Sequence, residues 1–168
     1  MTAQTLYVID GYNLLHRLTD LKGSKNDEME DRRLKLIRRL IGFSAGKQLQ
    51  FHLVFDAPPD RRGRENHPGV RVDYASPSAD DFIRYIIAQN QGSRQIVIVT
   101  SDRKDIGEYA RSCGLTWMEA ETFWKQFSIT GKKRSHHTAK EDGNAPSGWS
   151  SADTDWLRKA FEDHDRSL

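Results

Sequence analysis

The chain has 168 residues, of which 26 are Lys or Arg and 24 are Asp or Glu, with a net charge of +2 and 36% hydrophobic residues. This length suits one ordinary domain, and no apolar run approaches the roughly 18 residues of a membrane-spanning helix. The single cysteine excludes an internal disulfide framework and a cysteine-rich zinc site. Because the N-terminus also has no secretion-signal pattern, we expect a cytoplasmic protein that does not span a membrane.

The first half of the chain alternates strand and helix patterns. Residues 6–9 and 51–55 are almost continuously apolar, which is typical of strands buried on both faces of a parallel sheet. Between them, a helix beginning near residue 27 or 28 carries apolar residues on one stripe and basic residues on its other faces. Residues 70–74 alternate apolar and polar side chains, so we expect an edge strand or a hairpin arm there.

The same alternation continues to about residue 129. Ser78 can cap a helix for which Gly92 is a plausible terminator. The remaining expected elements are a buried strand, two helices and a short closing strand at residues 96–99, 103–112, 121–127 and 115–118. Strands that alternate with helices favour a three-layer α/β/α sandwich around a mostly parallel sheet, which is the fold class we predict.

The composition changes after about residue 129. Basic residues at 132–134 lead into a stretch from 136 to 151 with almost no aliphatic side chain, which is typical of a linker. A short amphipathic helix is expected at residues 153–164, with Trp156 on its apolar face. We therefore predict one domain over residues 1–130, followed by a flexible basic linker and a short helix over residues 131–168.

Acidic residues follow the predicted strands. Asp10, Asp56 and Asp102 come after the three buried apolar runs, and Asp80 and Asp81 begin the helix after the alternating run. In an open parallel sheet such positions meet at one edge, where ligands bind. One aspartate after a strand is commonly a turn or capping residue, but several at one edge repel one another unless a cation neutralises them. Carboxylates suit Mg²⁺ or Mn²⁺, and such a metal can activate water for phosphodiester hydrolysis.

Other chemistries fit the residues after the first strand less well. Gly11 to Leu15 form neither a dinucleotide fingerprint nor a Walker phosphate-binding loop. An aspartyl-phosphate phosphatase would carry a second aspartate where this chain has Tyr12. A phospho-accepting receiver domain would need an acidic pair at the first strand, and only Asp10 is present there. The scattered histidines do not complete a Ser-His-Asp set.

Four segments in this order resemble the YacP-like branch of the NYN domains, within the PIN-like nuclease superfamily. They are VIDGYNLL at residues 8–15, VFDA at 54–57, SADDFI at 78–83 and VTSDR at 99–103. The resemblance spans about residues 5–128 and does not include residues 131–168. It implies an α/β/α fold and a metal-dependent endoribonuclease, with RNA as the substrate and Mg²⁺ or Mn²⁺ as the cofactor. Some members act in the context of translation, so the ribosome is a further candidate partner.

The resemblance also implies roles for individual acidic and polar residues. Three aspartates fall on the family's acidic metal-binding positions, and one asparagine falls on the polar position after the first of them. A strand-end acid and two neighbouring acids are additional candidates. The candidate catalytic residues are Asp10, Asn13, Asp80 and Asp102, and the candidate metal ligands are Asp10, Asp56, Asp80, Asp81, Asp102 and Asp105.

Clustered basic residues are the candidates for RNA contact. Three follow a Pro-Pro pair in the loop after the second strand, three lie on the outer faces of the first helix, and one follows Asp102. A solvated loop or helix face explains each of them equally well alone, whereas together they suit a phosphate backbone held around an acidic metal site. The candidates are Arg61, Arg62, Arg64, Arg32, Arg38, Arg39 and Arg103.

Two other interpretations stay open at this stage. The chain could be a non-catalytic RNA-binding or ribosome-binding module that keeps the fold, because a fold does not establish an activity. The intact acidic set favours the enzyme, since a module has no need for carboxylates that repel one another. A toxin-like nuclease with a cognate inhibitor is the third interpretation. The sequence does not indicate the oligomeric state.

Overall fold

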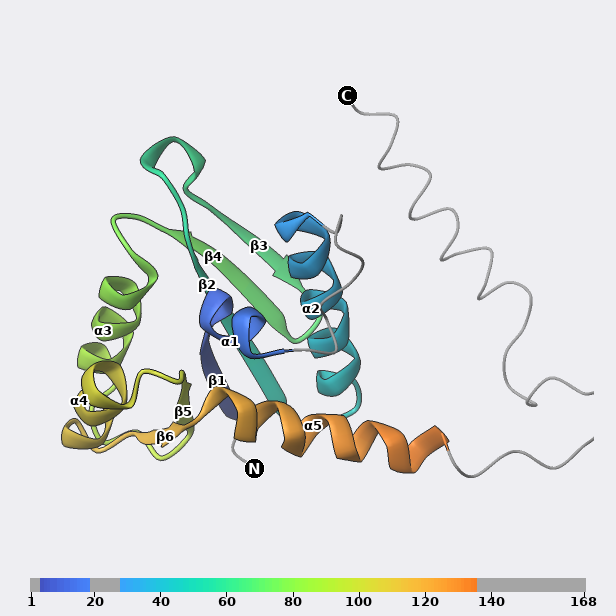
Figure 1. The fold of residues 1–168 in the computed structure, drawn as a ribbon. Helices are drawn as coiled ribbons and strands as arrows, with labels where there is room; N and C mark the ends of the chain where they lie inside the picture. Colours follow the sequence, from blue (N-terminus) through green and yellow to red (C-terminus); the bar gives the residue numbers. More distant parts are fainter. Residues whose placement is uncertain (1–3, 19–27, 136–168) are drawn as a thin grey trace, which may run out of the picture. The chain divides into compact units, whose positions relative to one another are not determined.

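A six-stranded sheet forms the centre of the molecule (Figure 1). The computed structural model describes residues 4–18 and 28–135. The strands are β1 (Thr5–Asp10), β2 (Leu49–Asp56), β3 (Gly63–His67), β4 (Val70–Ala75), β5 (Ile96–Val99) and β6 (Thr116–Met118), in the sheet order β3-β4-β2-β1-β5-β6. All neighbouring strands are parallel except β3, which runs antiparallel to β4. The predicted mostly parallel α/β fold is confirmed.

Helices cover both faces of this sheet. They are α1 (Gly11–Arg17), α2 (Met29–Ser44), α3 (Ala79–Gln89), α4 (Glu108–Ser112) and α5 (Ala120–Ser135), with a 3₁₀ turn η1 (Pro59–Arg61) and a π-helical turn η2 (Arg103–Gly107). Figure 1 shows α3 and α4 on one side of the sheet and α2 on the other. Among the described residues, no helix is long and apolar enough to cross a bilayer.

Alternation along the strands explains the two hydrophobic layers. In β2, Leu53 and Phe55 point to the layer that contains Leu36 of α2, whereas Val54 packs in the layer of Ile83 on α3. All five side chains are almost completely buried. Because both faces of the central strands are covered, their sequences read as continuous apolar runs, as the strand predictions assumed.

The hairpin at one edge of the sheet differs from expectation. Residues Val70–Ala75 form a hairpin arm, which was one of the two alternatives, but β4 is not an edge strand because it lies between β2 and β3. β3 was not predicted, because its residues, Gly-Arg-Glu-Asn-His at positions 63–67, show no alternation of apolar and polar side chains. Its register opposite β4 places Arg64 beside Asp73.

Two helices also differ from the predictions. Gly11–Arg17 forms α1, a helix of seven residues that the sequence analysis left unassigned. The last described helix was expected at 121–127, but α5 continues to Ser135, so the predicted domain boundary at residue 130 falls inside a helix. The rest of the predicted linker and the predicted helix at 153–164 lie outside the described residues.

Candidate active site at the carboxyl edge of the sheet

After the neighbouring strands β1 and β5, the chain continues on opposite faces of the sheet. β1 leads into α1, which packs in the layer of α2, whereas β5 leads through η2 into α4, which packs in the layer of α3. Between the carboxyl ends of such strands, a doubly wound sheet has a crevice where ligands bind. Asp10 ends β1 and Asp102 precedes η2, so both acids lie at this crevice.

Asp10 also begins α1. Its Oδ1 accepts a hydrogen bond of 3.0 Å from the backbone N–H of Asn13, which makes Asp10 the N-cap of the helix. The next residue, Gly11, is pressed against the ring of Phe55: a Cβ added at this position would lie 2.3 Å from a ring carbon. The tight contact explains why a glycine follows Asp10. It also holds the backbone next to Asp10 close to β2.

Asn13 joins α1 to the end of β5. Its Oδ1 accepts a hydrogen bond of 2.9 Å from the backbone N–H of Ser101. The hydroxyl of Ser101 is itself buried and has no hydrogen-bond partner among the described residues. A buried hydroxyl without a protein partner is suited to a bound water or a polar ligand group in the crevice.

Asp102 sits at the N-terminus of the π-helical turn. Its Oδ1 accepts a hydrogen bond of 3.0 Å from the backbone N–H of Asp105, and its own N–H donates to Oγ1 of buried Thr100 at 3.1 Å. π-Helical segments are rare and often occur at functional sites. The charges of both Asp102 and Asp105 act on Asp80 in the first turn of α3.

The other acids come from β2 and the start of α3. Asp56 Oδ1 accepts a hydrogen bond of 2.7 Å from the N–H of Ala79, which ties the start of α3 to the end of β2. Asp81 and Ser78 cap each other: the Asp81 N–H donates to Ser78 Oγ, and that hydroxyl donates to Asp81 Oδ2. Asp80 is exposed in the first turn of α3.

The acids act on one another electrostatically. Burial raises the pKa of Asp10 from an ordinary 3.8 to about 6, and the charges of Asp80, Asp56 and Asp102 add to the increase, against the lowering effect of the Asn13 N–H. The pKa of Asp80 is raised as well, first by burial and then by Asp56, Asp102 and Asp105. A bound divalent cation would relieve this repulsion.

The donor set suits a hard cation that keeps part of its water shell. Within residues 4–18 and 28–135, no group of three or more acidic, His or Cys side chains is already arranged as a metal site. Mg²⁺ is usually bound through one or two carboxylates together with waters and substrate phosphates, so it does not need a preformed protein cage. Asp10 and Asp102 offer carboxylate oxygens, and the unpartnered hydroxyl of Ser101 lies beside them.

Asp105 has a partner that the sequence did not reveal. Its Oδ1 accepts a hydrogen bond from Nη2 of Arg84, a residue of α3 that the sequence analysis did not single out. The only signal in the sequence is spacing, because Arg84 follows Asp80 by four residues and therefore lies on the same helix face. The charge of Arg84 lowers the pKa of Asp80, opposite to the effect of the acids.

The predicted RNA-contacting arginines separate into two groups. Two of them make structural hydrogen bonds: Arg32 Nη2 donates to the backbone oxygen of Leu15 at 2.7 Å, and Arg64 Nε donates to Asp73 Oδ1 at 2.9 Å. Five are exposed on η1, the residue after it, α2 and η2. These exposed residues are Arg61, Arg62, Arg38, Arg39 and Arg103.

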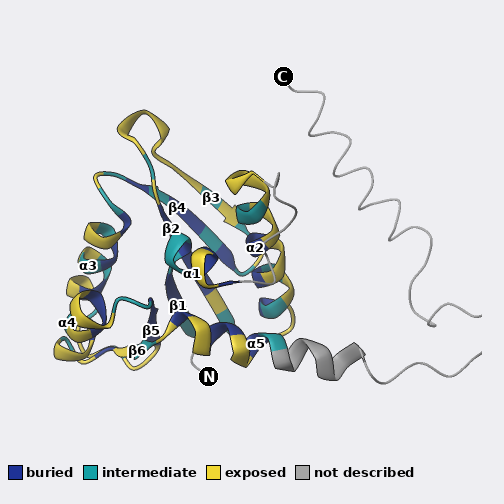
Figure 2. Ribbon diagram, in the orientation of Figure 1, coloured by how far each residue is buried: buried dark blue, intermediate teal, exposed yellow. Residues whose placement is uncertain are grey.

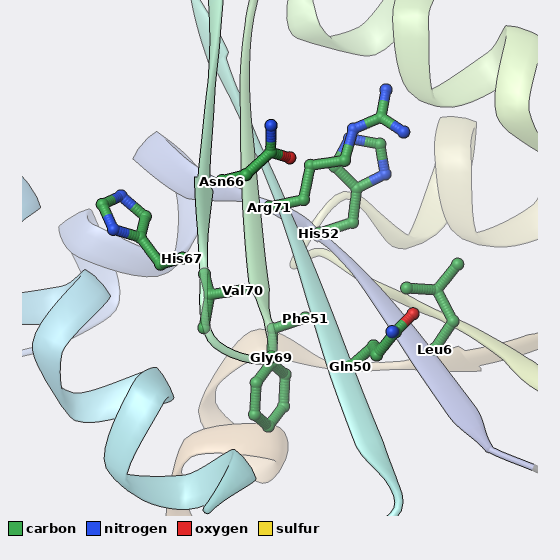
Figure 3. Close-up of a pocket in the computed structure, with 9 residues that line it drawn as sticks. All are labelled: Leu6, Gln50, Phe51, His52, Asn66, His67, Gly69, Val70 and Arg71. Carbon is green, nitrogen blue, oxygen red and sulfur yellow. The ribbon is translucent and has the colours of Figure 1, made fainter.

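Hollows in the surface occur at both ends of the strands. One of about 420 Å³ lies at the carboxyl edge, lined by Asp56 and prolines of the two adjoining loops. Another of about 280 Å³ is lined by polar side chains, including His52 and Arg71, and by residues near the amino ends of β1, β2 and β4 (Figure 3). The second hollow is therefore separate from the acidic crevice.

Comparisons with known proteins agree with this architecture. A profile of the YacP-like NYN domain family matches residues 7–163, which extends beyond residue 128, where the resemblance seen in the sequence ended. Crystal structures of a Bacillus subtilis protein are among those that are similar. Rae1 (YacP) from Bacillus subtilis has a TM-score of 0.67 and 23% identity over 98% of this chain and 96% of that chain. A point mutant of the same Bacillus subtilis protein has a TM-score of 0.61 and 22% identity over 79% and 80%. No curated protein matches.

Proposed function

Since this chain belongs to the YacP-like NYN domain family and has a PIN-like nuclease fold, we propose that it is a metal-dependent endoribonuclease. The observation that supports the proposal most is the raised pKa of Asp10, about 6, which is caused first by burial and then by the nearby charges of Asp80, Asp56 and Asp102. Strongly perturbed acids in a cleft are a common mark of a functional site.

In the proposed reaction, Asp10, Asp80 and Asp102 would hold Mg²⁺ or Mn²⁺. A bound metal would supply an activated water and charge stabilisation for phosphodiester hydrolysis. Asn13 keeps the Asp10 end of β1 beside the end of β5 through its bond to Ser101. Asp56 fixes the start of α3, and thereby the position of Asp80, through its bond to Ala79. Asp81 and Asp105 accept hydrogen bonds from the side chains of Ser78 and Arg84, whereas Asp10 and Asp102 accept theirs from backbone N–H groups. A side-chain partner competes with a metal, so Asp81 and Asp105 are weaker candidates for ligands.

RNA would reach this crevice across a basic surface. Arg61 and Arg62 are exposed beside η1, which follows the end of β2, and Arg103 is exposed in η2 next to Asp102. These arginines flank the acids from two strand ends, which suits contacts to phosphates on either side of the cleaved bond. The proposed substrates are messenger RNA or other RNA engaged in translation, and the proposed location is the cytoplasm.

A non-catalytic RNA-binding module is the second candidate. The hydrogen bonds of Asp10, Asp56, Asp81 and Asp102 favour it, because each gives the acid a structural role. These bonds do not explain why Asp10 is an acid that is buried near other acids, where its ionised form is disfavoured. An uncharged capping residue such as asparagine would serve a module equally well.

Cleavage of labelled RNA by the purified full-length chain tests the proposal. The assay is run with Mn²⁺, Mg²⁺ or EDTA on the native protein, Asp10→Asn and the control Asp31→Asn, which alters an exposed acid of α2. We expect metal-dependent cutting that Asp10→Asn reduces by about a hundredfold or more and Asp31→Asn leaves unchanged. Asp10→Asn should still bind RNA. Equal cutting by all three proteins, or no cutting with any metal, would contradict the proposal.

A further inference from the structure

The second turn of α3 places a cation at the rim of the acidic crevice. Arg84 lies one helical turn after Asp80, and its guanidinium donates a hydrogen bond to Asp105 of η2. The guanidinium carbon also lies 5.6 Å from the centre of the Tyr109 ring on α4. Arg84 is therefore held from two sides, next to two acids of the crevice.

The contacts with Asp105 and Tyr109 leave several N–H groups of Arg84 free to bind another acceptor. An arginine has five N–H donors, and the bond to Asp105 uses Nη2. The Arg84 side chain keeps 37% of its surface exposed. An exposed ion pair of this kind contributes only about 0–1 kcal/mol to stability. Arg84 is thus oriented without being enclosed, as a residue that receives a second anion would be.

An exposed aromatic ring follows directly in the chain. Tyr85 is 61% exposed, more than any other large hydrophobic side chain in the described part of the chain. Ala79, Ile83 and Ile87 form the buried stripe of α3, and Figure 2 shows the exposed stripe that alternates with it. Because Tyr85 follows Arg84 directly, the two side chains leave the helix about 100° apart, on either side of its exposed face. A cation and an exposed ring are the elements with which proteins bind single-stranded nucleic acid.

We propose that this turn of α3 binds a nucleotide that flanks the cleaved bond, with Arg84 on its phosphate and Tyr85 stacked on its base. This inference rests on the proposed nuclease function and adds a subsite for one nucleotide beside the acids. A base can stack on Tyr85 only if it is not already paired and stacked in a duplex, so the site selects single-stranded RNA. Asp105 then serves to orient Arg84.

Binding measurements separate this site from the cleavage chemistry. The affinity of the full-length Asp10→Asn protein for a labelled single-stranded RNA and for the matching duplex is measured at fixed salt, with and without a second substitution. Arg84→Ala and Tyr85→Ala should each weaken single-strand binding about tenfold and change duplex binding little. The controls are Arg94→Ala, an exposed arginine just before β5, and Leu34→Ala, an exposed apolar residue of α2. Both should stay within about twofold.

A modified substrate identifies the group that Arg84 contacts. An uncharged methylphosphonate placed at the flanking linkage should weaken binding by the protein that carries Arg84. It should have little further effect on Arg84→Ala, because the charge that Arg84 contacts is already absent. Additive losses would overturn the assignment to that phosphate. Thermal unfolding of each variant verifies that the changes in affinity are not caused by unfolding.

The outcomes distinguish this inference from the proposed function. If the native protein cuts RNA but Arg84→Ala and Tyr85→Ala bind like their controls, the inference is wrong and the nuclease stands. If the native protein does not cut with any metal while both variants lose single-strand binding, the nuclease proposal fails and the nucleotide site stands. Equal losses for single strand and duplex would overturn the strand selectivity.

Asp105→Asn tests the orienting role separately. If Asp105 positions Arg84, this variant should raise the KM for single-stranded RNA and leave the Mn²⁺ concentration for half-maximal cutting unchanged. A shift of that Mn²⁺ concentration would show instead that Asp105 is a metal ligand. Mn²⁺ binding measured by calorimetry gives the same comparison without turnover.

Discussion

The side-chain oxygen of Asn13 accepts a hydrogen bond of 2.9 Å from the backbone N–H of Ser101, although 88 residues separate them. β1 pairs with β5 in parallel, with Ile9 opposite Val99, and this pairing brings Asn13 close to Ser101. One amide thereby sets the spacing between the end of β1, which carries Asp10, and the segment that carries Asp102.

Asn13→Ala should affect activity more than stability. The substitution leaves the Ser101 N–H without its partner, which costs about 1 kcal/mol of unfolding free energy. We expect cleavage to fall about tenfold or more, because a small misplacement of catalytic groups is costly. Denaturant unfolding and cleavage rates measure the two effects. Asn66→Ala, at an exposed position of β3, serves as the control, and similar cleavage by both variants would contradict the positioning role.

Gly11→Ala should destabilise the fold and disturb the site. Its Cβ would lie 2.3 Å from the Phe55 ring, so β2 or α1 must shift, at a cost of about 1–3 kcal/mol. Gly42→Ala in α2 is the matched control because nothing lies within 4 Å of its added Cβ. That change should stabilise the helix by about 0.5–1 kcal/mol. Denaturant unfolding of both variants gives the comparison, and equal effects would refute the steric argument.

Asp10→Asn should stabilise the metal-free protein at neutral pH. The pKa of Asp10 is raised to about 6 in the fold, so the folded chain binds a proton more tightly than the unfolded chain and stability falls as pH rises between about 4 and 6. Asparagine removes this penalty, which is on the order of 3 kcal/mol, and can still accept the Asn13 hydrogen bond. In EDTA, the gain in melting temperature should be large near pH 7.5 and small near pH 4. A gain that does not depend on pH would contradict this origin.

Asp73→Asn should weaken the hairpin edge of the sheet. The Asp73 carboxylate is 9% exposed and accepts hydrogen bonds from His52, Arg64 and Arg71 at 2.6, 2.9 and 2.7 Å. Removing the charge of such a buried acid costs about 3 kcal/mol. Glu121→Gln breaks only an exposed pair with Lys125 and is the control. Denaturant unfolding of the two variants measures the difference.

The pH dependence of Asp73 runs opposite to that of Asp10. Burial alone would raise the pKa of Asp73, but its hydrogen bonds to Arg64, Arg71 and His52 hold it below the usual value. Its stabilising contribution is therefore complete above the ordinary pKa and is lost as pH falls through the lowered one. The difference in unfolding free energy between the native protein and Asp73→Asn should shrink as pH falls below the ordinary aspartate pKa of about 4. A difference that grows over this range would refute the assignment.

The sequence predicted the parts of the fold that burial alone determines. β1, β2 and β5 are covered on both faces, so their apolar runs were sufficient evidence. α1 was missed because a seven-residue helix opening with Asp-Gly looks like a turn. β3 was missed because it is an edge strand held by polar pairs such as Arg64 with Asp73, which depend on tertiary register.

The candidate site shows the same division. Topology places strand-end residues such as Asp10 and Asp102 at one edge, and the chain order of the strands was enough to expect this. The partners of these residues were not predictable. The bond of Arg84 to Asp105 joins α3 to η2, and the bond of Arg32 to the backbone of Leu15 joins α2 to α1. Such pairs arise from packing between elements far apart in the sequence.

The pairing of β1 with β5 also determines when the acidic crevice can exist. Residues 6–9 must wait for residues 96–99 before they gain that neighbour, and Asp102 follows only three residues later. During synthesis, a growing chain that ends before this point has Asp10, Asp56 and Asp80 but no opposite wall. The complete set of acids can therefore come together only after about the first hundred residues have been synthesised and have folded.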